Sequence, residues 1–178
     1  ILGRVRDLWR ERRGDIDSSA DAVARALGEG APAGPAAAID EDFLGRASSV
    51  FASLYDAVNG GFGGAPKFPS AHNLLFLLRR WKLAGDEKAG TMALETLKRM
   101  RMGGIYDQLG YGFHRYSTDG KWLVPHFEKM LYDQAMLALA YAEAYAATGD
   151  PLFASTGREL FEYVSRDLSA PEGCFYSA

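Results

Sequence analysis

Three histidines, His72, His114 and His126, are the side chains of this sequence best suited to proton transfer near neutral pH. Two of them fall within GYGFHRYSTDGKWLVPHFEKMLYD, residues 110–133, which also holds several acidic and aromatic side chains. An imidazole can act as an acid or a base because its ordinary pKa lies close to neutrality. This segment is therefore the first candidate for a functional site.

The spacing of the residues in this segment suggests which side chains share a face. Strand alternation places His114 and Tyr116 on one face of a hairpin. If the chain becomes helical at Pro125, the spacing i, i+3, i+7 aligns His126, Lys129 and Asp133 along one side of the helix. Lys129 and Asp133 could equally form an ordinary ion pair on that helix.

Other side chains have competing interpretations. Glu128 lies about 200° from His126 on an ideal helix, so the two could act together only if the first turn is irregular. Trp122 could stack on a sugar ring or pack in the core. Lys67 follows GGFGGAP, which is no phosphate-binding loop because no Ser or Thr follows the lysine. His72 could be a partly buried residue at a helix start, and no histidine spacing matches a metal-ligand pattern.

The elements that must position these residues read as helices that alternate between amphipathic and almost wholly apolar. Apolar helices are buried between other elements, so the order is outer, inner, outer, inner, outer. The outer-to-inner connections are long and begin alike, with GGFGG, GGIYD and GCFYS. This recurrence predicts an all-α toroid or solenoid of helical hairpins. Asp40, Ser70, Asp86 and Asp150 are the expected helix caps, and the expected helices end near residues 58, 84, 100, 149 and 168.

One β-hairpin is expected within this helical array, because Asp119-Gly120 between GFHRYS and KWLVP is a two-residue turn signal. Successive helices run in opposite directions, so all outer-to-inner connections share one end of the assembly. The three histidines fall in these connections or at the first turn of an inner helix. We therefore expect them around a common mouth, the end at which the inner helices begin.

Composition limits the classes of partner and the domain organisation. The chain has 178 residues, 48% of them hydrophobic, and a net charge of −3, which gives no reason to expect binding to nucleic acid or to an anionic membrane. Two short helices, Arg4–Arg13 and Ser18–Leu27, precede GEGAPAGPAAA, a predicted linker at residues 28–38. The expected division is a helical linker region, 1–39, and a toroid region, 40–178.

Redox and targeting signals are sparse in this sequence. The single cysteine, Cys174, excludes an internal disulfide framework. No apolar run reaches the roughly 18 residues of a membrane span, and the sequence opens without a signal-peptide pattern. A cytoplasmic location is therefore expected. The sequence lacks an initiator Met and stops in an extended segment, so we expect a piece of a longer protein.

Three motifs closely resemble the spermatogenesis-associated protein 20 family: GGFGGAPKFP at 60–69, GGIYDQLGYGFHRYS at 103–117 and WLVPHFEKMLYDQA at 122–135. The resemblance implies a thioredoxin-like domain, absent here, fused to an (α/α)6 barrel of the six-hairpin glycosidase and N-acylglucosamine 2-epimerase type. This chain would hold the first part of that barrel, roughly two and a half hairpins. The family usually has a third glycine where this chain has Tyr111.

The resemblance implies a carbohydrate-processing domain, and the first hypothesis is a sugar isomerase or 2-epimerase. His114 and His126 would be the acid and base, with Asp107 or Glu128 orienting them or holding sugar hydroxyls. A glycosidase-like hydrolase that pairs Asp107 with Glu128 or Asp133 is one alternative. A non-catalytic carbohydrate- or protein-binding module is another, and a purely structural role for the motifs is a third.

All of these hypotheses except the structural role share their partners and their binding residues. A saccharide ligand and the thioredoxin-like domain in cis are the expected partners, and no metal or other cofactor is expected. A partial barrel would expose apolar area of its inner helices, so we expect self-association through an open seam and no activity from this chain alone. The candidate substrate-binding residues are Tyr116, Trp122, Lys129, Asp133, His72 and Lys67.

Overall fold

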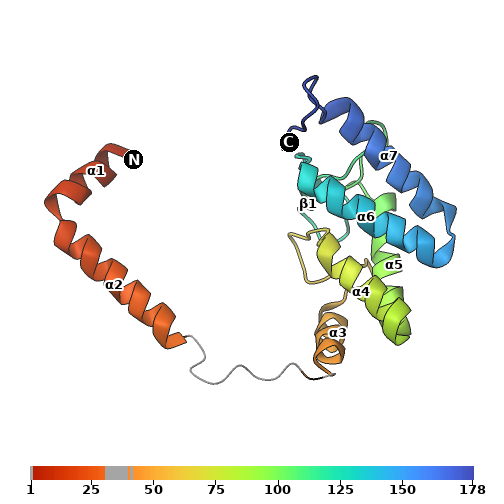
Figure 1. Cartoon of the computed structure of the whole chain (residues 1–178), viewed down its shortest axis with the longest axis horizontal. Helices are drawn as coiled ribbons and strands as arrows, with labels where there is room; N and C mark the ends of the chain where they lie inside the picture. Colours follow the sequence, from red (N-terminus) through yellow and green to blue (C-terminus); the bar gives the residue numbers. More distant parts are fainter. Residues whose placement is uncertain (1, 31–39, 41) are drawn as a thin grey trace. The chain divides into compact units, whose positions relative to one another are not determined.

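The computed structural model describes residues 2–30, 40 and 42–178. The chain divides into two compact units, Ile1–Asp40 and Glu41–Ala178 (Figure 1). Among the described residues, none of the helices combines the length and the apolar character that a membrane crossing requires. The candidate site residues all belong to the second unit.

The first unit consists of two helices, α1 (Leu2–Glu11) and α2 (Arg13–Gly30). The expected second helix with a cap at Ser18 or Ser19 is wrong, because α2 begins five residues earlier, at Arg13. Ion pairs between Arg12 and Asp15 and between Arg13 and Asp17 support this first turn. Most of the predicted linker, residues 31–38, lies outside the described residues.

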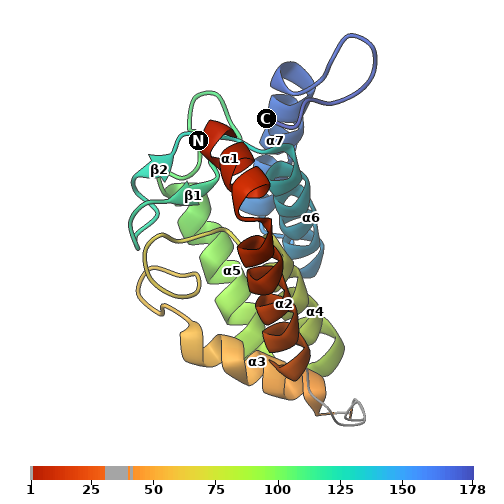
Figure 2. The same ribbon diagram turned by 90° about the vertical axis from the view of Figure 1, so that its left-hand side faces the viewer.

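The second unit confirms the predicted alternation of outer and inner helices. The inner helices α4 and α6 pack against each other, α5 and α7 cover α4 and α6 respectively, and α3 contacts both α4 and α5. Together they form part of an α/α toroid with one inserted antiparallel hairpin (Figures 1 and 2). The five helices are α3 (Phe43–Leu54), α4 (Ala71–Ala84), α5 (Glu87–Met102), α6 (Leu131–Thr148) and α7 (Pro151–Asp167).

The core lies between the two inner helices and α5. Leu74 and Leu77 of α4 and Leu137 of α6 are fully buried, and each such side chain contributes about 1.5–3 kcal/mol through removal from water. The Tyr141 hydroxyl donates to the Leu97 carbonyl at 2.8 Å, which satisfies the one polar group of that buried ring. The other side of α6 remains open, because Met136, Leu139 and Tyr145 are exposed.

Two of the four predicted helix caps are confirmed. The Asp86 carboxylate accepts from the N–H of Ala89, and the Asp150 carboxylate accepts from the N–H of Leu152. The other two are wrong. The helix expected after Asp40 begins at Phe43, and it ends at Leu54 instead of extending to Val58. Ser70 precedes α4, but its backbone is left-handed, with φ 45°, and its side chain makes no capping hydrogen bond.

The hairpin is present, but its turn is longer than predicted. Strand β1 (Tyr116–Ser117) pairs antiparallel with β2 (Pro125–His126), with Tyr116 opposite His126. The connection spans residues 118–124 instead of the two-residue turn at Asp119-Gly120. The Asp119 carboxylate accepts from the backbone N–H groups of Lys121, Leu123 and Val124, and so organises a wider loop.

The predicted start of the second inner helix is also wrong. Helix α6 begins at Leu131, and His126 belongs to β2, so His126, Lys129 and Asp133 do not share a helix face. Tertiary contacts hold the intervening backbone away from helical geometry. The Glu128 carbonyl accepts from the Arg115 N–H at 2.7 Å, and the Lys129 ammonium is bound to the preceding loop.

The two outer-to-inner connections meet at one end of the unit, where α4 and α6 begin. Lys67 and Ser117 exchange both backbone hydrogen bonds at 2.8 Å, which joins the α3–α4 connection to the hairpin. Figures 1 and 2 both show these connections side by side. We call this end, formed by residues 55–70 and 103–130 and the first turns of α4 and α6, the mouth.

Candidate functional site

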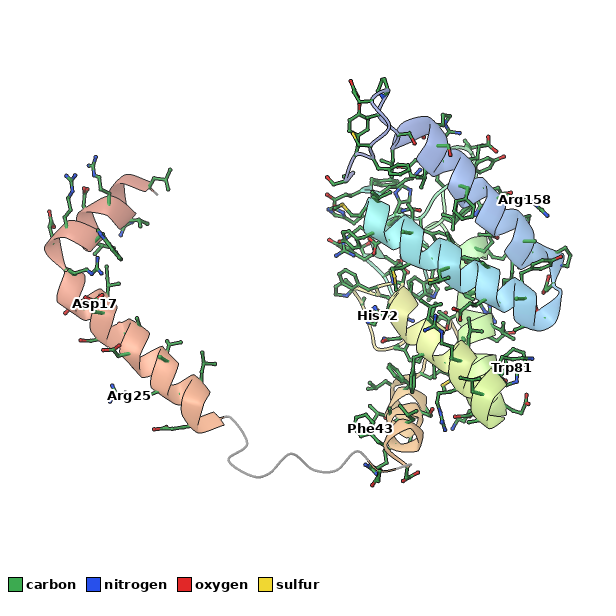
Figure 3. All side chains as sticks on the ribbon, in the orientation of Figure 1. Asp17, Arg25, Phe43, His72, Trp81 and Arg158 are labelled. Atoms are coloured by element: carbon green, nitrogen blue, oxygen red, sulfur yellow. The ribbon has the colours of Figure 1, made fainter. Side chains whose placement is uncertain are left out.

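A cavity of about 290 Å³ lies in the mouth, at the N-terminal ends of the two inner helices. His72 stands on the first turn of α4, at the opposite end of that helix from Trp81 (Figure 3). Tyr132 and Asp133 come from the first turn of α6. The side chains of its wall that carry rings, charge or sulfur are Phe68, His72, Arg115, Tyr132, Asp133 and Met136.

An ion pair between Arg115 and Asp133 forms the polar part of this wall. Arg115 Nη1 lies 3.1 Å from Asp133 Oδ2. Burial raises the pKa of Asp133 above its ordinary value, and the attraction of Arg115 only partly opposes this effect. The guanidinium also lies 5.4 Å from the ring centroid of Phe68 and 5.0 Å from that of Tyr132, so two aromatic faces hold it in place.

Four of these six wall side chains, Phe68, Arg115, Tyr132 and Met136, are not among the sequence candidates. Arg115 lies between His114 and Tyr116, directly before β1, and its position between two candidates is the signal that could have identified it. Nothing local to the sequence pairs Arg115 with Asp133, which lies 18 residues further along the chain.

A row of rings leads from the cavity wall to His126. The centroids of Phe68 and Tyr116 are 4.9 Å apart, and those of Tyr116 and His126 are 4.8 Å apart with nearly parallel planes. The His126 side chain is about half exposed, and its Nδ1 atom lies 3.8 Å from Glu128. None of Tyr116, His126 and Glu128 lines the cavity. Tyr116 contacts the wall residue Phe68, and His126 lies one ring further out with Glu128 beside it. We call these three residues the rim.

His114 occupies a more enclosed position than the other two histidines. Its ring packs edge-on against Phe127, with centroids 5.2 Å apart. Its Nδ1 atom is buried and makes no hydrogen bond with the described residues. Burial, assisted by the positive charge of Lys129 and opposed by Asp107, lowers the pKa of His114. The neutral imidazole is therefore the form that this environment favours.

Lys129 and Asp107 form a second ion pair, which closes the loop between α5 and the hairpin. Lys129 Nζ lies 2.8 Å from Asp107 Oδ2 and 2.6 Å from the Tyr111 carbonyl. Asp107 also accepts from the N–H groups of Leu109 and Gly110. Burial raises the pKa of Asp107, but these hydrogen bonds outweigh it and lower the pKa to about 2. These contacts fix the loop that carries His114.

Lys67 and Trp122, two of the candidate substrate-binding residues, lie inside the protein. Lys67 is fully buried, and its ammonium donates to Asp56 at 2.7 Å and to the carbonyls of Gly60 and Gly120. Trp122 is 1% exposed, and its indole N–H donates to the Asn59 carbonyl. Neither side chain offers a surface to a ligand, so the expectation of binding roles for them is corrected: both join the two connections of the mouth.

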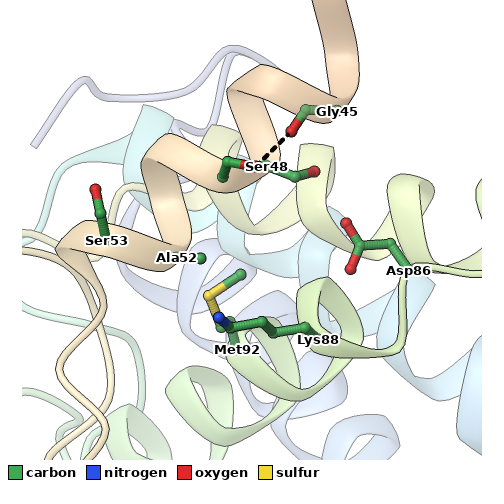
Figure 4. Close-up of a pocket in the computed structure, with 8 residues that line it drawn as sticks. Gly45, Ser48, Ala52, Ser53, Asp86, Lys88 and Met92 are labelled. Carbon is green, nitrogen blue, oxygen red and sulfur yellow. Dashed lines mark hydrogen bonds between the residues drawn. The ribbon is translucent and has the colours of Figure 1, made fainter. Parts of the chain in front are cut away.

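A separate hollow of about 410 Å³ lies between α3 and the start of α5 (Figure 4). Its wall includes Asp86, which is engaged as the cap of α5, and Ser48, whose buried hydroxyl oxygen makes no hydrogen bond with the described residues. Its lining residues include none of the sequence candidates. Within residues 2–30, 40 and 42–178, no group of three or more His, Cys, Asp or Glu side chains could hold a metal ion.

The fold thus gathers the predicted residues into three groups. His72 and Asp133 line the cavity, and Tyr116, His126 and Glu128 belong to its rim. A neighbouring cluster holds the enclosed imidazole and the second ion pair, His114, Asp107 and Lys129. The third group, Lys67 and Trp122, lies in the interior.

Solved structures of low sequence identity share the fold of this chain. The chain is similar to solved cellobiose 2-epimerases from Bacillus thermoamylovorans (TM-score 0.62, 19% identity, covering 70% of this chain and 35% of that one) and from Spirochaeta thermophila (TM-score 0.64, 21% identity, covering 73% and 35%). At these identities the likeness shows a common helical toroid fold.

Sequence relatives extend over the whole chain, although no protein-family model matches it. The whole chain is 41% identical to part of spermatogenesis-associated protein 20 of Homo sapiens and spans 24% of the length of that protein. The protein of that name from Mus musculus is 51% identical over 128 residues, which are 70% of this chain and 16% of that protein. The chain therefore spans a quarter or less of these relatives. By this similarity along its entire length, the chain belongs to the spermatogenesis-associated protein 20 family.

Proposed function

We propose that this chain supplies a saccharide-binding mouth and that the full-length protein acts there as a sugar isomerase or epimerase through histidine acid–base chemistry. One observation carries the proposal: the cavity at the starts of α4 and α6 brings together an imidazole, two aromatic rings and a charged hydrogen-bonding pair. Aromatic faces suit the apolar faces of a sugar ring, and a few convergent polar groups suit its hydroxyls. The similarity to cellobiose 2-epimerases supports the same class of ligand.

The positions of the imidazoles favour His72 and His126 as the groups that transfer protons. His72 lines the cavity, and His126 is about half exposed on its rim with Glu128 beside it. In the proposed reaction, a neutral imidazole takes the proton from the carbon next to the anomeric centre, and an imidazolium returns a proton to the other face. No oxidant or reductant is required. The enclosed ring of His114 suits a positioning role better than the acid or base role expected from the sequence.

The ends of the inner helices add an electrostatic argument. Removal of a proton from that carbon leaves negative charge on the neighbouring oxygen. Helix N-termini carry free N–H groups and the positive end of the helix dipole, which stabilise such charge. Neither Ser70 nor Met130, the residues that precede α4 and α6, caps its helix with a side-chain hydrogen bond. The Leu131 N–H donates to the Ser177 carbonyl, so the other N–H groups in the first turns of α4 and α6 are the backbone donors that support the proposal.

Exchange of a carbon-bound proton with solvent tests this proposal directly. The full-length protein would be incubated in D₂O with glucose, mannose, N-acetylglucosamine or cellobiose, and the proton at C2 followed by NMR. We expect loss of the C2 signal with at least one sugar, and we expect His72→Gln and His126→Gln to abolish exchange while binding persists. Arg158→Gln on the exposed side of α7 is the control (Figure 3). Binding without exchange would favour a binding module, and neither binding nor exchange would refute the proposal.

A further inference from the structure

We propose that Asp133 sets the charge selectivity of the mouth: by neutralising Arg115 it admits uncharged sugars and disfavours anionic ones. This inference rests on the proposed function, because it names the class of sugar that the same cavity accepts. The Arg115–Asp133 ion pair is partly buried. The side chain of Arg115 is 28% exposed and that of Asp133 is 15% exposed, so water screens their interaction less than that of an exposed pair.

Arg115 has the features of an anion site that is already occupied. A guanidinium presents a planar fork of donors that matches carboxylate and phosphate groups. Here Nη1 contacts both carboxylate oxygens of Asp133, at 3.1 and 3.4 Å. The rings of Phe68 and Tyr132 hold the guanidinium group in this position. A preorganised cation beside a ligand cavity would attract an anionic sugar strongly if its own carboxylate were removed.

Other charges of the mouth are balanced in the same manner. Burial is the main cause of the raised pKa of Asp133, and the negative charge of Glu128 adds to it. An incoming anion would therefore meet two carboxylates as well as one neutralised guanidinium. The neighbouring cations are also paired with carboxylates: Lys129 with Asp107 and Lys67 with Asp56. The balance favours hydroxyl recognition over recognition of charge.

The same inner face provides a matched control pair. Arg79 of α4 lies 2.6 Å from Glu143 of α6. Neither residue lines the mouth cavity, although one hollow that Arg79 borders shares His72 and Met136 with that cavity. Glu143→Gln therefore releases an arginine on the same helices without changing the cavity wall. If anion binding depended only on net charge, Glu143→Gln and Asp133→Asn would have the same effect.

Binding of three sugars with one ring size, measured by calorimetry on the full-length protein, tests the inference. We expect the parent protein to bind glucose more tightly than glucose 6-phosphate or glucuronate. Asp133→Asn should raise the affinity for both anions relative to glucose by about tenfold or more, because it frees a charge-assisted hydrogen-bond donor. Glu143→Gln should leave this ratio unchanged, and adding Arg115→Gln to Asp133→Asn should restore the preference for glucose.

The outcomes separate this inference from the proposed function. Equal or tighter binding of the anions by the parent, or an unchanged ratio in Asp133→Asn, would refute the selectivity and leave sugar binding intact. Failure of every sugar to bind would refute both. If Asp133→Asn does not fold, as judged by circular dichroism, Arg115→Gln alone decides: it should weaken the anions about tenfold more than glucose, and equal losses for all three would refute the inference.

Discussion

Lys67 and Asp56 form an ion pair in which the lysine is fully buried and the two charged atoms are 2.7 Å apart. The same ammonium donates to the carbonyls of Gly60 and Gly120. One ammonium group is thus hydrogen-bonded both to the α3–α4 connection and to the hairpin loop. A buried ammonium is stable only when its donors are satisfied, so this contact holds the two connections of the mouth together.

Replacement of this lysine should weaken the fold strongly. Lys67→Met keeps most of the apolar stem but removes the cation from Asp56 and the donor from two carbonyl groups. Asp56 then keeps only its hydrogen bonds from Val58 and Asn59. We expect the free energy of unfolding to fall by about 3–5 kcal/mol, as for the breaking of a buried ion pair. Urea denaturation measures it. Lys88→Met on the exposed side of α5 is the control and should change stability by less than about 0.5 kcal/mol. A similar small change for Lys67→Met would contradict the assignment.

The arrangement of helices could be predicted from the sequence because local patterns decide it. The apolar run Leu74–Leu78 indicates a buried helix, and Asp86 and Asp150 cap the helices that follow them. The shared end of the outer-to-inner connections then follows from the alternation of helix direction. His72 lies in the first turn of α4, and His126 lies in β2 of the connection before α6.

The details of the mouth could not be predicted, because contacts distant in sequence decide them. Pro125 suits a first helical turn, yet pairing with β1 draws Pro125–His126 into a strand. A lysine is rarely buried, so nothing in GGFGGAPKF indicates the interior position of Lys67. The role of Arg115 depends on Asp133, which belongs to another element. The local periodicity of the sequence predicts none of these three features.

Acid should remove the contribution of Asp107 to stability. Its pKa of about 2 lies below the ordinary value of 3.8, so the native state favours the ionised form. The resulting stability is present above pH 4 and is lost as the pH falls toward 2. At pH 7 we expect Asp107→Asn to lower the free energy of unfolding by about 1–2 kcal/mol. Urea denaturation should show that the difference in free energy of unfolding between the parent and Asp107→Asn disappears as the pH falls toward 2. Glu172→Gln, at an exposed position, should not change the free energy of unfolding at any pH in this range. If the loss in Asp107→Asn is the same at every pH, the ionised carboxylate is not its cause.

The pKa of His114 should respond to Lys129. Burial is the main cause of its lowered pKa, and the positive charge of Lys129 adds to it. Lys129→Gln removes this charge and leaves the attraction of Asp107, so the pKa of His114 should rise. NMR titration of the imidazole signals measures it. Lys121→Gln in the exposed part of the hairpin loop is the control. If the pKa of His114 is unchanged or lower in Lys129→Gln, the charge of Lys129 does not lower the pKa of this imidazole.

The chain alone should self-associate, as its sequence suggested. Leu131, Ala138 and Phe161 border an apolar groove of about 340 Å³ between α6 and α7, and the Phe161 ring is 61% exposed. Burial of such a face against a second copy is favourable. Sedimentation velocity of the 178-residue chain should show dimers or larger species that Phe161→Ser weakens. Glu162→Ser is the neighbouring control, and a monomer at every concentration would exclude the association.

Tyr111 has a left-handed backbone, with φ 64°, in the region that favours glycine. A Cβ atom is strained in the left-handed region, whereas glycine is not. Tyr111→Gly and Tyr111→Ala both remove the ring, but only glycine relieves the strain. We therefore expect the Gly variant to be more stable than the Ala variant by about 1 kcal/mol in urea denaturation.

Tyr116 gives the matched comparison, because it lies in β1 with an ordinary backbone. There the Ala variant should be the more stable of the two, by about 0.5–1 kcal/mol, since glycine loses more conformational entropy on folding. The order of the Gly and Ala variants should therefore invert between the two tyrosines. If Ala is the better substitute at both positions, the left-handed backbone at Tyr111 does not decide which residue is tolerated there.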